Sequence, residues 1–250
     1  MFVRLRWTAE ECSQKRVQVQ ETAIGLVDSR SGNCYVDVMF ITFEGIDLSG
    51  KSTQAQWLCR RLESAGVARG SQHAVHLLRE PGGTALSERL REILLDRSHV
   101  RMNPWTELFL FSAARAQLVT EVILPALQRG DIVICDRFYD STTAYQGYGR
   151  GLDLEVIHRI NRAATGGTDP DLTIVVDIPV ELVDHRRAEA ALAKDRMETS
   201  GKTFFERVRA GYGEIAAQEP HRVVRINGAA PADAVEQDVW RAVSRLGVVA

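Results

Sequence analysis

Short apolar runs recur along the chain, separated by longer segments in which apolar residues return every three or four positions. Each run is continuous rather than alternating, which is typical of strands buried on both faces of a sheet. Such runs alternating with helical segments predict an α/β fold, with a mostly parallel five-stranded sheet covered by helices on both faces. The expected strands are Phe40–Phe43, Ala74–Leu78, Asp131–Cys135, Leu172–Ile178 and Arg222–Ile226.

The segments between these runs carry helical signals. Asn103 and Pro104 suit an N-cap and a first helical turn, and Gly130 suits a helix stop, so one long helix is expected from Asn103 to Arg129. Apolar residues also return at helical spacing between Ala55 and Leu62. The other expected helices are Ala85–Leu95, Pro179–Ala191 and Pro231–Leu246.

Residues 1–38 differ from the rest because they precede the first strand and contain the turn-like run Asp28–Asn33. Two interpretations stay open: an extension with little structure, or a short hairpin of Arg16–Ile24 and Tyr35–Val38. We predict a folded domain over residues 39–250 and a poorly structured N-terminal extension over residues 1–38. The extension has neither an arginine-rich amphipathic presequence nor an apolar signal core, so we expect a cytoplasmic protein.

Composition and charge narrow the range of partners. The formal net charge is −2 and the charges are mixed along the chain, which disfavours nucleic acid or a membrane surface and leaves a small anionic ligand open. The apolar stretch Leu108–Leu127 is interrupted by Arg115 and Glu121, so no membrane span of about 18 apolar residues is expected. The four cysteines have no CxxC spacing, which suits reduced thiols in the cytosol.

The first strand runs directly into a glycine-bounded loop that satisfies the pattern GxxxxGK[ST]. In such a loop the backbone N–H groups and the start of the next helix form a site for a polyphosphate. The lysine reaches the outer phosphates and the serine hydroxyl ligates Mg²⁺; a purely structural glycine turn is the alternative. The residues expected to contact the nucleotide are Gly45, Ile46, Asp47, Leu48, Ser49, Gly50, Lys51, Ser52 and Thr53.

Polar residues follow the next two strands at their carboxyl ends, where ligands collect in open α/β sheets. Arg79 and the Pro81–Gly83 turn follow the second strand, either as part of a second substrate site or as an ordinary turn. Asp136 ends the third strand, where a Walker B acid holds Mg²⁺, and Arg137 beside it suits phosphate. Further hydroxyl, aromatic and amide side chains follow at Ser141, Thr142, Tyr145 and Gln146.

Two further groups have competing interpretations. Phe111 and Arg115 project from the same helix face, either as a ligand-binding pair or as a core aromatic beside a solvated arginine. A basic segment after the fourth strand is either a lid that neutralises a transferred phosphate or a solvated helix face. Its cations are Arg186, Arg187, Lys194 and Arg196.

The chain closely resembles the thymidylate kinase family in five motifs taken in order: FEGIDLSGKST, REPGGT, FLFSAARAQ, DRFYDSTTAYQG and DRME. The resemblance covers about Met39 to Leu246. It implies a P-loop NTPase fold of the nucleoside-monophosphate-kinase type with a lid. It also implies that the protein phosphorylates dTMP to dTDP with ATP and Mg²⁺, and that it is commonly a homodimer.

For ATP, the resemblance implies that Lys51 cradles the phosphates, Ser52 binds Mg²⁺ and Asp136 supports the metal shell. Leu48 stands where some members carry a P-loop arginine, so this chain is expected to place catalytic cations in the lid. The lid has alanine and glutamate where many bacterial members have further arginines. The expected catalytic residues are Lys51, Arg137, Arg187 and Lys194, with Arg186 at the ATP site.

For dTMP, the resemblance implies that Asp47 lies near the 3′-hydroxyl and that Arg79 and Arg137 bind the phosphate. Tyr145 is expected under the deoxyribose, where it excludes a 2′-hydroxyl.

At the thymine base, the resemblance implies that Phe111 stacks on the ring, Arg115 donates to a base oxygen and Thr142 faces the base edge. The full set expected to bind dTMP is Asp47, Arg79, Pro81, Phe111, Arg115, Arg137, Ser141, Thr142, Tyr145 and Gln146. Other P-loop kinases and a catalytically silent ATP-binding protein are the rivals. A GTPase would need an N/TKxD motif, which the sequence lacks.

Overall fold

The computed structural model describes residues 39–64, 74–190 and 196–247. The predictions for residues 1–38 and for Lys194 lie outside this part of the chain. Within it, five strands form one parallel sheet in the order β2-β3-β1-β4-β5, which confirms the predicted α/β fold. The strands are β1 Met39–Glu44, β2 Val75–Arg79, β3 Ile132–Asp136, β4 Leu172–Asp177 and β5 Val223–Asn227.

The carboxyl ends of three neighbouring strands are level. Phe43 on β1 pairs with Asp136 on β3, and Asp136 in turn pairs with Arg79 on β2. The loops that follow these strands therefore leave the sheet at one edge. Because the chain runs from β1 towards β2 and β3 and then returns to β4 on the other side, this edge is where a ligand crevice forms in open α/β sheets.

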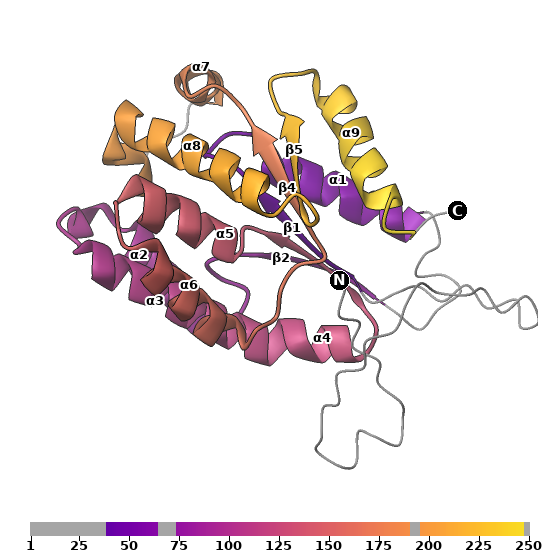
Figure 1. Ribbon diagram of the computed structural model, residues 1–250, viewed down its shortest axis with the longest axis horizontal. Coiled ribbons are helices and arrows are strands. Elements are labelled where there is room, and N and C mark those ends of the chain that lie inside the picture. Colours follow the sequence, from indigo (N-terminus) through magenta and orange to yellow (C-terminus); the bar gives the residue numbers. More distant parts are fainter. Residues whose placement is uncertain (1–38, 65–73, 191–195, 248–250) are drawn as a thin grey trace, which may run out of the picture. The chain divides into compact units, whose positions relative to one another are not determined.

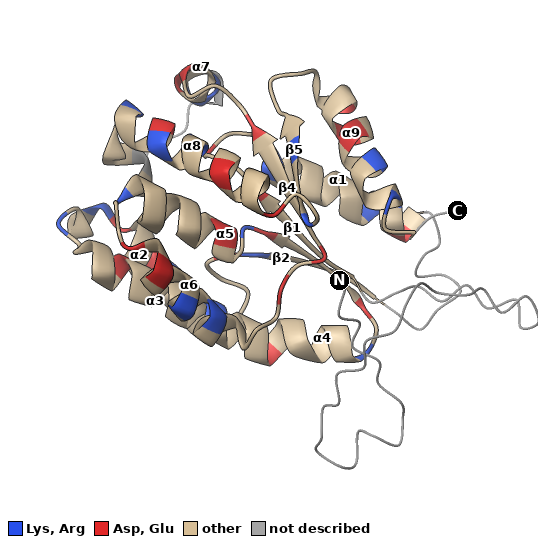
Figure 2. Ribbon diagram, in the orientation of Figure 1, with Lys and Arg blue, Asp and Glu red and all other residues tan. Residues whose placement is uncertain are grey.

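Helices cover both faces of the sheet (Figure 1). Helices α1 (Lys51–Ser64) and α9 (Ala232–Ser244) lie together on one side. The other side carries α3 (Pro104–Leu118), α5 (Tyr139–Thr142), α6 (Leu154–Thr165) and α8 (Lys202–Gln218). The remaining helices are α2 Ala85–Leu95, α4 Leu124–Gln128 and α7 Glu181–Ala190, with short 3₁₀ helices η2 Arg97–His99 and η5 Met197–Ser200. Charges of both signs are interspersed over these helices (Figure 2).

The long helix predicted from Asn103 to Arg129 is interrupted. A π-helical turn, η3 (Val119–Ile123), separates α3 from α4, and Pro125 lies in the first turn of α4. Proline has no N–H to donate and its ring crowds the preceding turn, so the helical ladder must widen ahead of it.

Helices α6 and α8 were not predicted. For α6 the signals were present, since Asp153 caps its first turn and Gly166 ends it with a φ of 60°. For α8 the interior glycines weaken the helical signal. The structure explains Gly211, because a Cβ there would lie 2.6 Å from the ring of Tyr148. Tyr148 belongs to a second π-helical segment, η4 (Thr143–Gly149), which packs against α8.

Within the described part of the chain, hydrophobic clusters lie between the sheet and these helices, and two of them bear on the site. One joins β1 and β3 to the α3–α4 segment and includes Phe40, Leu118, Ile123, Val133 and Phe138. The other lies against α8 and includes Ile46, Tyr145, Val175, Phe204 and Val208. Because Ile46 and Tyr145 belong to this second cluster, core packing fixes two of the residues predicted for the site.

By length and composition alone, the segment Pro104–Gln128 could cross a membrane, and it is the only such helix in the described part of the chain. However, Leu108 and Leu118 are buried in the core. Glu107 and Arg115 are also buried, and each pairs with an opposite charge on another element. Since these pairs tie the segment to the rest of the domain, we interpret it as a packed core helix.

Candidate active site

The loop between β1 and α1 has the backbone shape that the P-loop prediction requires. Gly45, Leu48 and Gly50 have positive φ angles of 134°, 60° and 96°. A Cβ on Gly45 would lie 2.4 Å from the carbonyl oxygen of Val176 on β4, so only glycine fits there. The loop leads into Lys51 at the start of α1, an arrangement that suits an anion.

Arg186 on α7 reaches this loop, but it binds the protein backbone. Its NH1 group donates to the carbonyl oxygens of Leu48 at 2.9 Å and Ser49 at 3.0 Å. Its NH2 group donates to the carbonyl oxygen of Gly228 at 2.8 Å. Arg186 therefore ties the P-loop to the loop that follows β5.

The predicted metal ligands come together. The Ser52 hydroxyl donates a hydrogen bond to one carboxylate oxygen of Asp136. The other oxygen, Oδ1, is buried and has no hydrogen-bond partner among the described residues. Lys51 is buried nearby, and burial together with the positive charge of Arg137 lowers the pKa of its amine.

These residues fit Mg²⁺ bound together with a nucleotide. No group of three His, Cys, Asp or Glu side chains that could hold a metal occurs in the described ranges. Ser52 and Asp136 therefore supply two protein oxygens. Mg²⁺ usually takes one or two protein ligands and completes its shell with water and substrate phosphates, so this donor set suits it.

Arg137 is the centre of a polar cluster beside the P-loop. It has a positive φ of 72°, which is unusual for a residue other than glycine. Its guanidinium lies 2.5 Å from Asp47 Oδ1 and donates to the hydroxyls of Tyr145 and Ser141, both at 3.1 Å. Tyr145 in turn donates to Asp47 at 3.1 Å. Burial opposes ionisation, but the charges of Arg137 and Lys51 still lower the pKa of Asp47.

Glu44 at the end of β1 holds the start of α5 against this cluster. It accepts hydrogen bonds from the backbone N–H groups of Phe138 (2.7 Å) and Ser141 (3.2 Å). The hydroxyls of Ser141 and Tyr212 donate to its other oxygen at 2.5 and 2.8 Å. Burial, with the nearby charge of Asp140, raises the pKa of Glu44.

Arg115 is fully buried, so the solvated interpretation of this arginine is wrong. Its Nε donates to Glu80 Oε2 at 2.8 Å, its NH1 to the Thr142 hydroxyl at 3.0 Å, and its NH2 to the carbonyl oxygen of Phe138 at 3.2 Å. Phe111, one turn earlier on α3, is partly buried against the α8 cluster. The predicted pair therefore lies on one helix, with the arginine already held by protein groups.

Arg79 ends β2, and Pro81 lies on the loop that follows it. Arg79 is half-exposed, and its NH2 group donates to both carboxylate oxygens of Glu88, at 2.9 and 3.1 Å. Glu88 also accepts from the backbone N–H of Gly83 at 2.8 Å. The carbonyl oxygen of Pro81 accepts from Arg91 at 3.0 Å. This places the Arg79 cation at the level of Asp136, paired with Glu88 in the first turn of α2.

Gln146 points to a buried carboxylate. It donates to Glu107 on α3 at 2.8 Å, and the same carboxylate pairs with Arg150 at 3.1 Å and Arg196 at 2.7 Å. Burial alone would raise the pKa of Glu107, but these hydrogen bonds and charges outweigh it and lower the pKa below its ordinary value.

Within the basic segment, the structure describes Arg186, Arg187 and Arg196 but not Lys194. Arg187 and Arg196 are buried. Arg196 also donates to the carbonyl oxygen of Leu94 at 2.6 Å. The interpretation of these arginines as a solvated helix face is therefore wrong.

The structure thus brings the P-loop, the end of β3 and the start of α5 to one edge of the sheet. It leaves Thr53 exposed on the first turn of α1. Sequence reasoning missed four side chains that hold the site: Glu44, Glu80, Glu107 and Tyr212. Glu44 ends β1 and Glu80 follows β2, and both lie within the motifs FEGIDLSGKST and REPGGT, so their position was a usable signal. Glu107 and Tyr212 lie inside helices and carried none.

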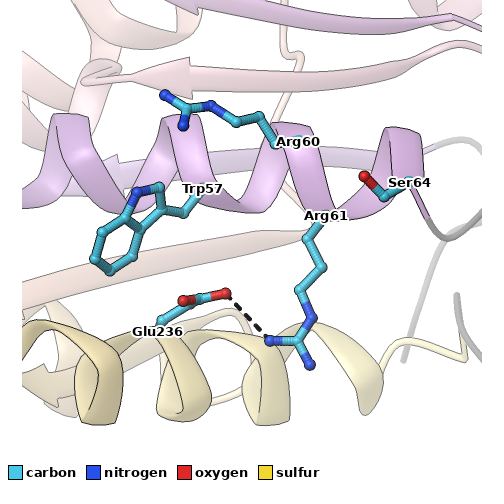
Figure 3. Close-up of a pocket in the computed structure, with 5 residues that line it drawn as sticks. All are labelled: Trp57, Arg60, Arg61, Ser64 and Glu236. Carbon is cyan, nitrogen blue, oxygen red and sulfur yellow. Dashed lines mark hydrogen bonds and ion pairs between the residues drawn. The ribbon is translucent and has the colours of Figure 1, made fainter.

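A hollow of about 330 Å³ lies between α1 and α9, away from these residues (Figure 3). It is lined by Trp57, Arg60, Arg61, Ser64 and Glu236. Within it, Arg61 pairs with Glu236 at 3.3 Å and lies 4.0 Å from the centre of the Trp240 ring. Since Arg61 holds the two helices together through these contacts, we interpret the hollow as a structural junction.

Comparison with known proteins identifies the family. A family model described as thymidylate kinase matches residues 43–239. The chain is 46% identical over 203 residues to the thymidylate kinase of Pelotomaculum thermopropionicum, covering 81% of this chain and 91% of that protein. It is 48% identical over 203 residues to the enzyme of Desulfovibrio desulfuricans, covering 79% and 91%. The crystal structure of thymidylate kinase from Ehrlichia chaffeensis is similar, with a TM-score of 0.66 and 36% identity over 83% of this chain and 99% of that one. With its parallel sheet and P-loop, the chain therefore belongs to the thymidylate kinase family and is a nucleoside monophosphate kinase.

Proposed function

We propose that this protein transfers the terminal phosphoryl group of ATP to dTMP, giving dTDP, with Mg²⁺ as the metal. One observation supports this most strongly. The Ser52–Asp136 pair and the cluster of Asp47, Arg137 and Tyr145 meet at the same edge of the sheet. A nucleotide triphosphate on the P-loop and a monophosphate beside Arg137 would therefore face each other.

On the ATP side, the P-loop N–H groups and Lys51 hold the phosphates, and Arg186 keeps the loop in shape through its carbonyl oxygens. Ser52 and Asp136 would hold Mg²⁺, which neutralises charge on the phosphate oxygens when bound. Burial excludes water around Lys51, so its charge is weakly screened. Arg187 and Lys194 are proposed as the lid cations that stabilise the transferring group.

On the acceptor side, Arg137 and Arg79 bind the dTMP phosphate. Asp47 receives the 3′-hydroxyl and Tyr145 closes the space where a 2′-hydroxyl would lie. Phe111 stacks on thymine and Arg115 donates to O4, with Thr142 at the base edge. Ser141 and Gln146 support these groups through Arg137 and Glu107.

We also propose a homodimer in the cytoplasm, with residues 39–250 as the catalytic domain, residues 1–38 as an extension and neither nucleic acid nor membrane as a partner. Helices α2 and α3 pack together and expose large apolar side chains: Leu86, Ile93, Trp105 and Phe109. Each helix presents its pair at helical spacing, so these residues form a face rather than isolated points. Such a face suits a two-fold contact between copies. Sedimentation measures the mass of the wild type and of Phe109→Asp in solution. We expect a dimeric wild type and a monomeric variant, and a monomeric wild type would contradict the dimer.

The function is tested by measuring ADP release with dTMP, dUMP, dCMP and UMP as acceptors. We expect the highest kcat/KM with dTMP and a loss of activity without Mg²⁺. A preference for dCMP or UMP would overturn the acceptor assignment. ATP binding without turnover of any acceptor would instead indicate a silent nucleotide-binding protein.

A further inference from the structure

Glu80 and Arg115 form a buried ion pair between the loop after β2 and helix α3. The side chains are only 3% and 2% exposed, and Arg115 Nε lies 2.8 Å from Glu80 Oε2. The backbone of Glu80 is also fixed, since its N–H donates to the carbonyl oxygen of Asp136 at 2.9 Å. Glu80 therefore connects the end of β3 to the arginine on α3.

This pair decides the direction of the whole guanidinium group. Arginine has five N–H donors in a rigid planar fork, so a partner on Nε orients NH1 and NH2 as well. Three hydrogen bonds of Arg115 go to Glu80, Thr142 and Phe138. Of these partners only Glu80 is charged. The fork is thus set by one carboxylate and two neutral oxygens, and donors remain on NH1 and NH2.

One carboxylate oxygen of Glu80 accepts no hydrogen bond from the described residues. This oxygen, Oε1, is buried. A buried carboxylate normally uses both oxygens, so a side chain that served only to neutralise Arg115 would be expected to take further donors. Among the described residues, the only hydrogen bond of the Glu80 side chain is the one that orients the Arg115 guanidinium.

We propose that Glu80 is a positioning residue for base choice: it holds the Arg115 fork so that the remaining N–H groups meet an oxygen, rather than an amino group, on the edge of the acceptor pyrimidine. This inference rests on the proposed function. Without Glu80, the fork loses its only anionic partner and can turn. A turned fork still fills the site but no longer distinguishes O4 of thymine from the amino group of cytosine.

The test compares kcat/KM for dTMP and dCMP in wild type, Glu80→Ala, Glu80→Gln, Arg115→Ala and the double variant Glu80→Ala/Arg115→Ala. We expect Glu80→Ala to lower kcat/KM for dTMP about tenfold to a hundredfold, mostly through KM, and to reduce the preference over dCMP. Glu80→Gln keeps an acceptor for Nε and should restore part of that preference. In the Arg115→Ala background, Glu80→Ala should change base choice by less than about threefold, because its effect passes through Arg115.

The control is Glu121→Ala, which removes an exposed carboxylate from the same helical segment and should leave base choice unchanged. If Glu80→Ala does not fold, Glu80→Gln carries the comparison alone. Equal base choice in wild type and the folded Glu80 variants overturns the positioning role. So does an undiminished effect of Glu80→Ala when Arg115 is absent. A wild-type enzyme that does not prefer dTMP overturns the proposed function instead.

Discussion

The proposed donor and acceptor sides of the site are held in different ways. On the donor side the shape comes from the backbone, through the positive φ angles of Gly45 and Gly50 and the hydrogen bonds of Arg186 to carbonyl oxygens. On the acceptor side the cations are held by side chains: Arg137 by Asp47, and Arg79 by Glu88. A backbone conformation has no partners to exchange, whereas an ion pair does. Before any substrate binds, the P-loop already has its binding conformation, whereas the cations proposed for the acceptor are paired with carboxylates of the protein.

This difference separates the two acceptor arginines as well. The Arg79–Glu88 pair is 49% and 43% exposed, and such pairs contribute about 0–1 kcal/mol. Its exchange for a phosphate therefore costs little. The Asp47–Arg137 pair is far less exposed, and breaking it would leave a poorly solvated carboxylate. We expect Arg79 to change partner when dTMP binds and Arg137 to keep Asp47.

The largest effect is expected at Lys51. Replacing it with alanine should leave a folded protein whose turnover falls by several orders of magnitude, because phosphoryl transfer depends on charge stabilisation. Turnover is measured by ADP release with saturating dTMP, and folding by circular dichroism. Near-normal turnover would contradict the P-loop assignment.

Arg186→Ala tests whether the hydrogen bonds of Arg186 to backbone carbonyl oxygens shape the P-loop. Loss of three hydrogen bonds to carbonyl oxygens should loosen the P-loop and raise KM for ATP about tenfold to a hundredfold, with little change in KM for dTMP. Arg241→Ala is the matched control, since Arg241 is exposed on α9 and pairs only with Asp238 among the described contacts. Equal KM values for ATP in the two variants would contradict a role of Arg186 in shaping the ATP site.

Tyr145→Phe probes the acceptor cluster more gently. It keeps the ring but removes the hydroxyl that joins Arg137 to Asp47 at 3.1 Å on each side. We expect KM for dTMP to rise about threefold to tenfold, the equivalent of one hydrogen bond. Tyr145→Ala should additionally admit UMP. Unchanged sugar choice in the alanine variant would contradict the role of the ring.

A pH dependence of stability is expected as well, with no change in the chemistry of the site. Burial raises the pKa of Glu80 from 4.5 to about 7, despite the attraction of Arg115. Between these values the folded state binds more protons than the unfolded chain, so this group stabilises the fold at low pH and loses that contribution as pH rises through about 7. Urea unfolding of wild type and Glu80→Gln between about pH 5 and 8 should show a wild-type advantage that shrinks by on the order of 1–3 kcal/mol. Parallel curves would show that Glu80 does not titrate there.

The same division explains what the sequence could reveal. The P-loop depends on neighbouring residues, Gly45 to Ser52, so its shape was predictable from a contiguous pattern. The pair of Glu80 and Arg115 joins residues 35 apart, and that of Glu107 and Arg196 joins residues 89 apart. No local periodicity reports such pairs, because they exist only once strands and helices have packed. Hence Arg115, Arg187 and Arg196 were open to a solvated interpretation that the tertiary structure excludes.

The strand order β2-β3-β1-β4-β5 has one more consequence. Most of the residues proposed to read the acceptor follow β2 or β3 or lie between them, whereas Arg186 and Gly228, which shape the P-loop, follow β4 and β5. With β1 as the boundary, most of the groups proposed to read the acceptor lie on one half of the sheet and the groups that shape the P-loop lie on the other; Asp136 at the end of β3 and Asp47 in the P-loop are exceptions. A protein engineer could therefore recode the pyrimidine that this kinase accepts by changing residues that follow β2 and β3, while Asp136 and the P-loop stay unchanged.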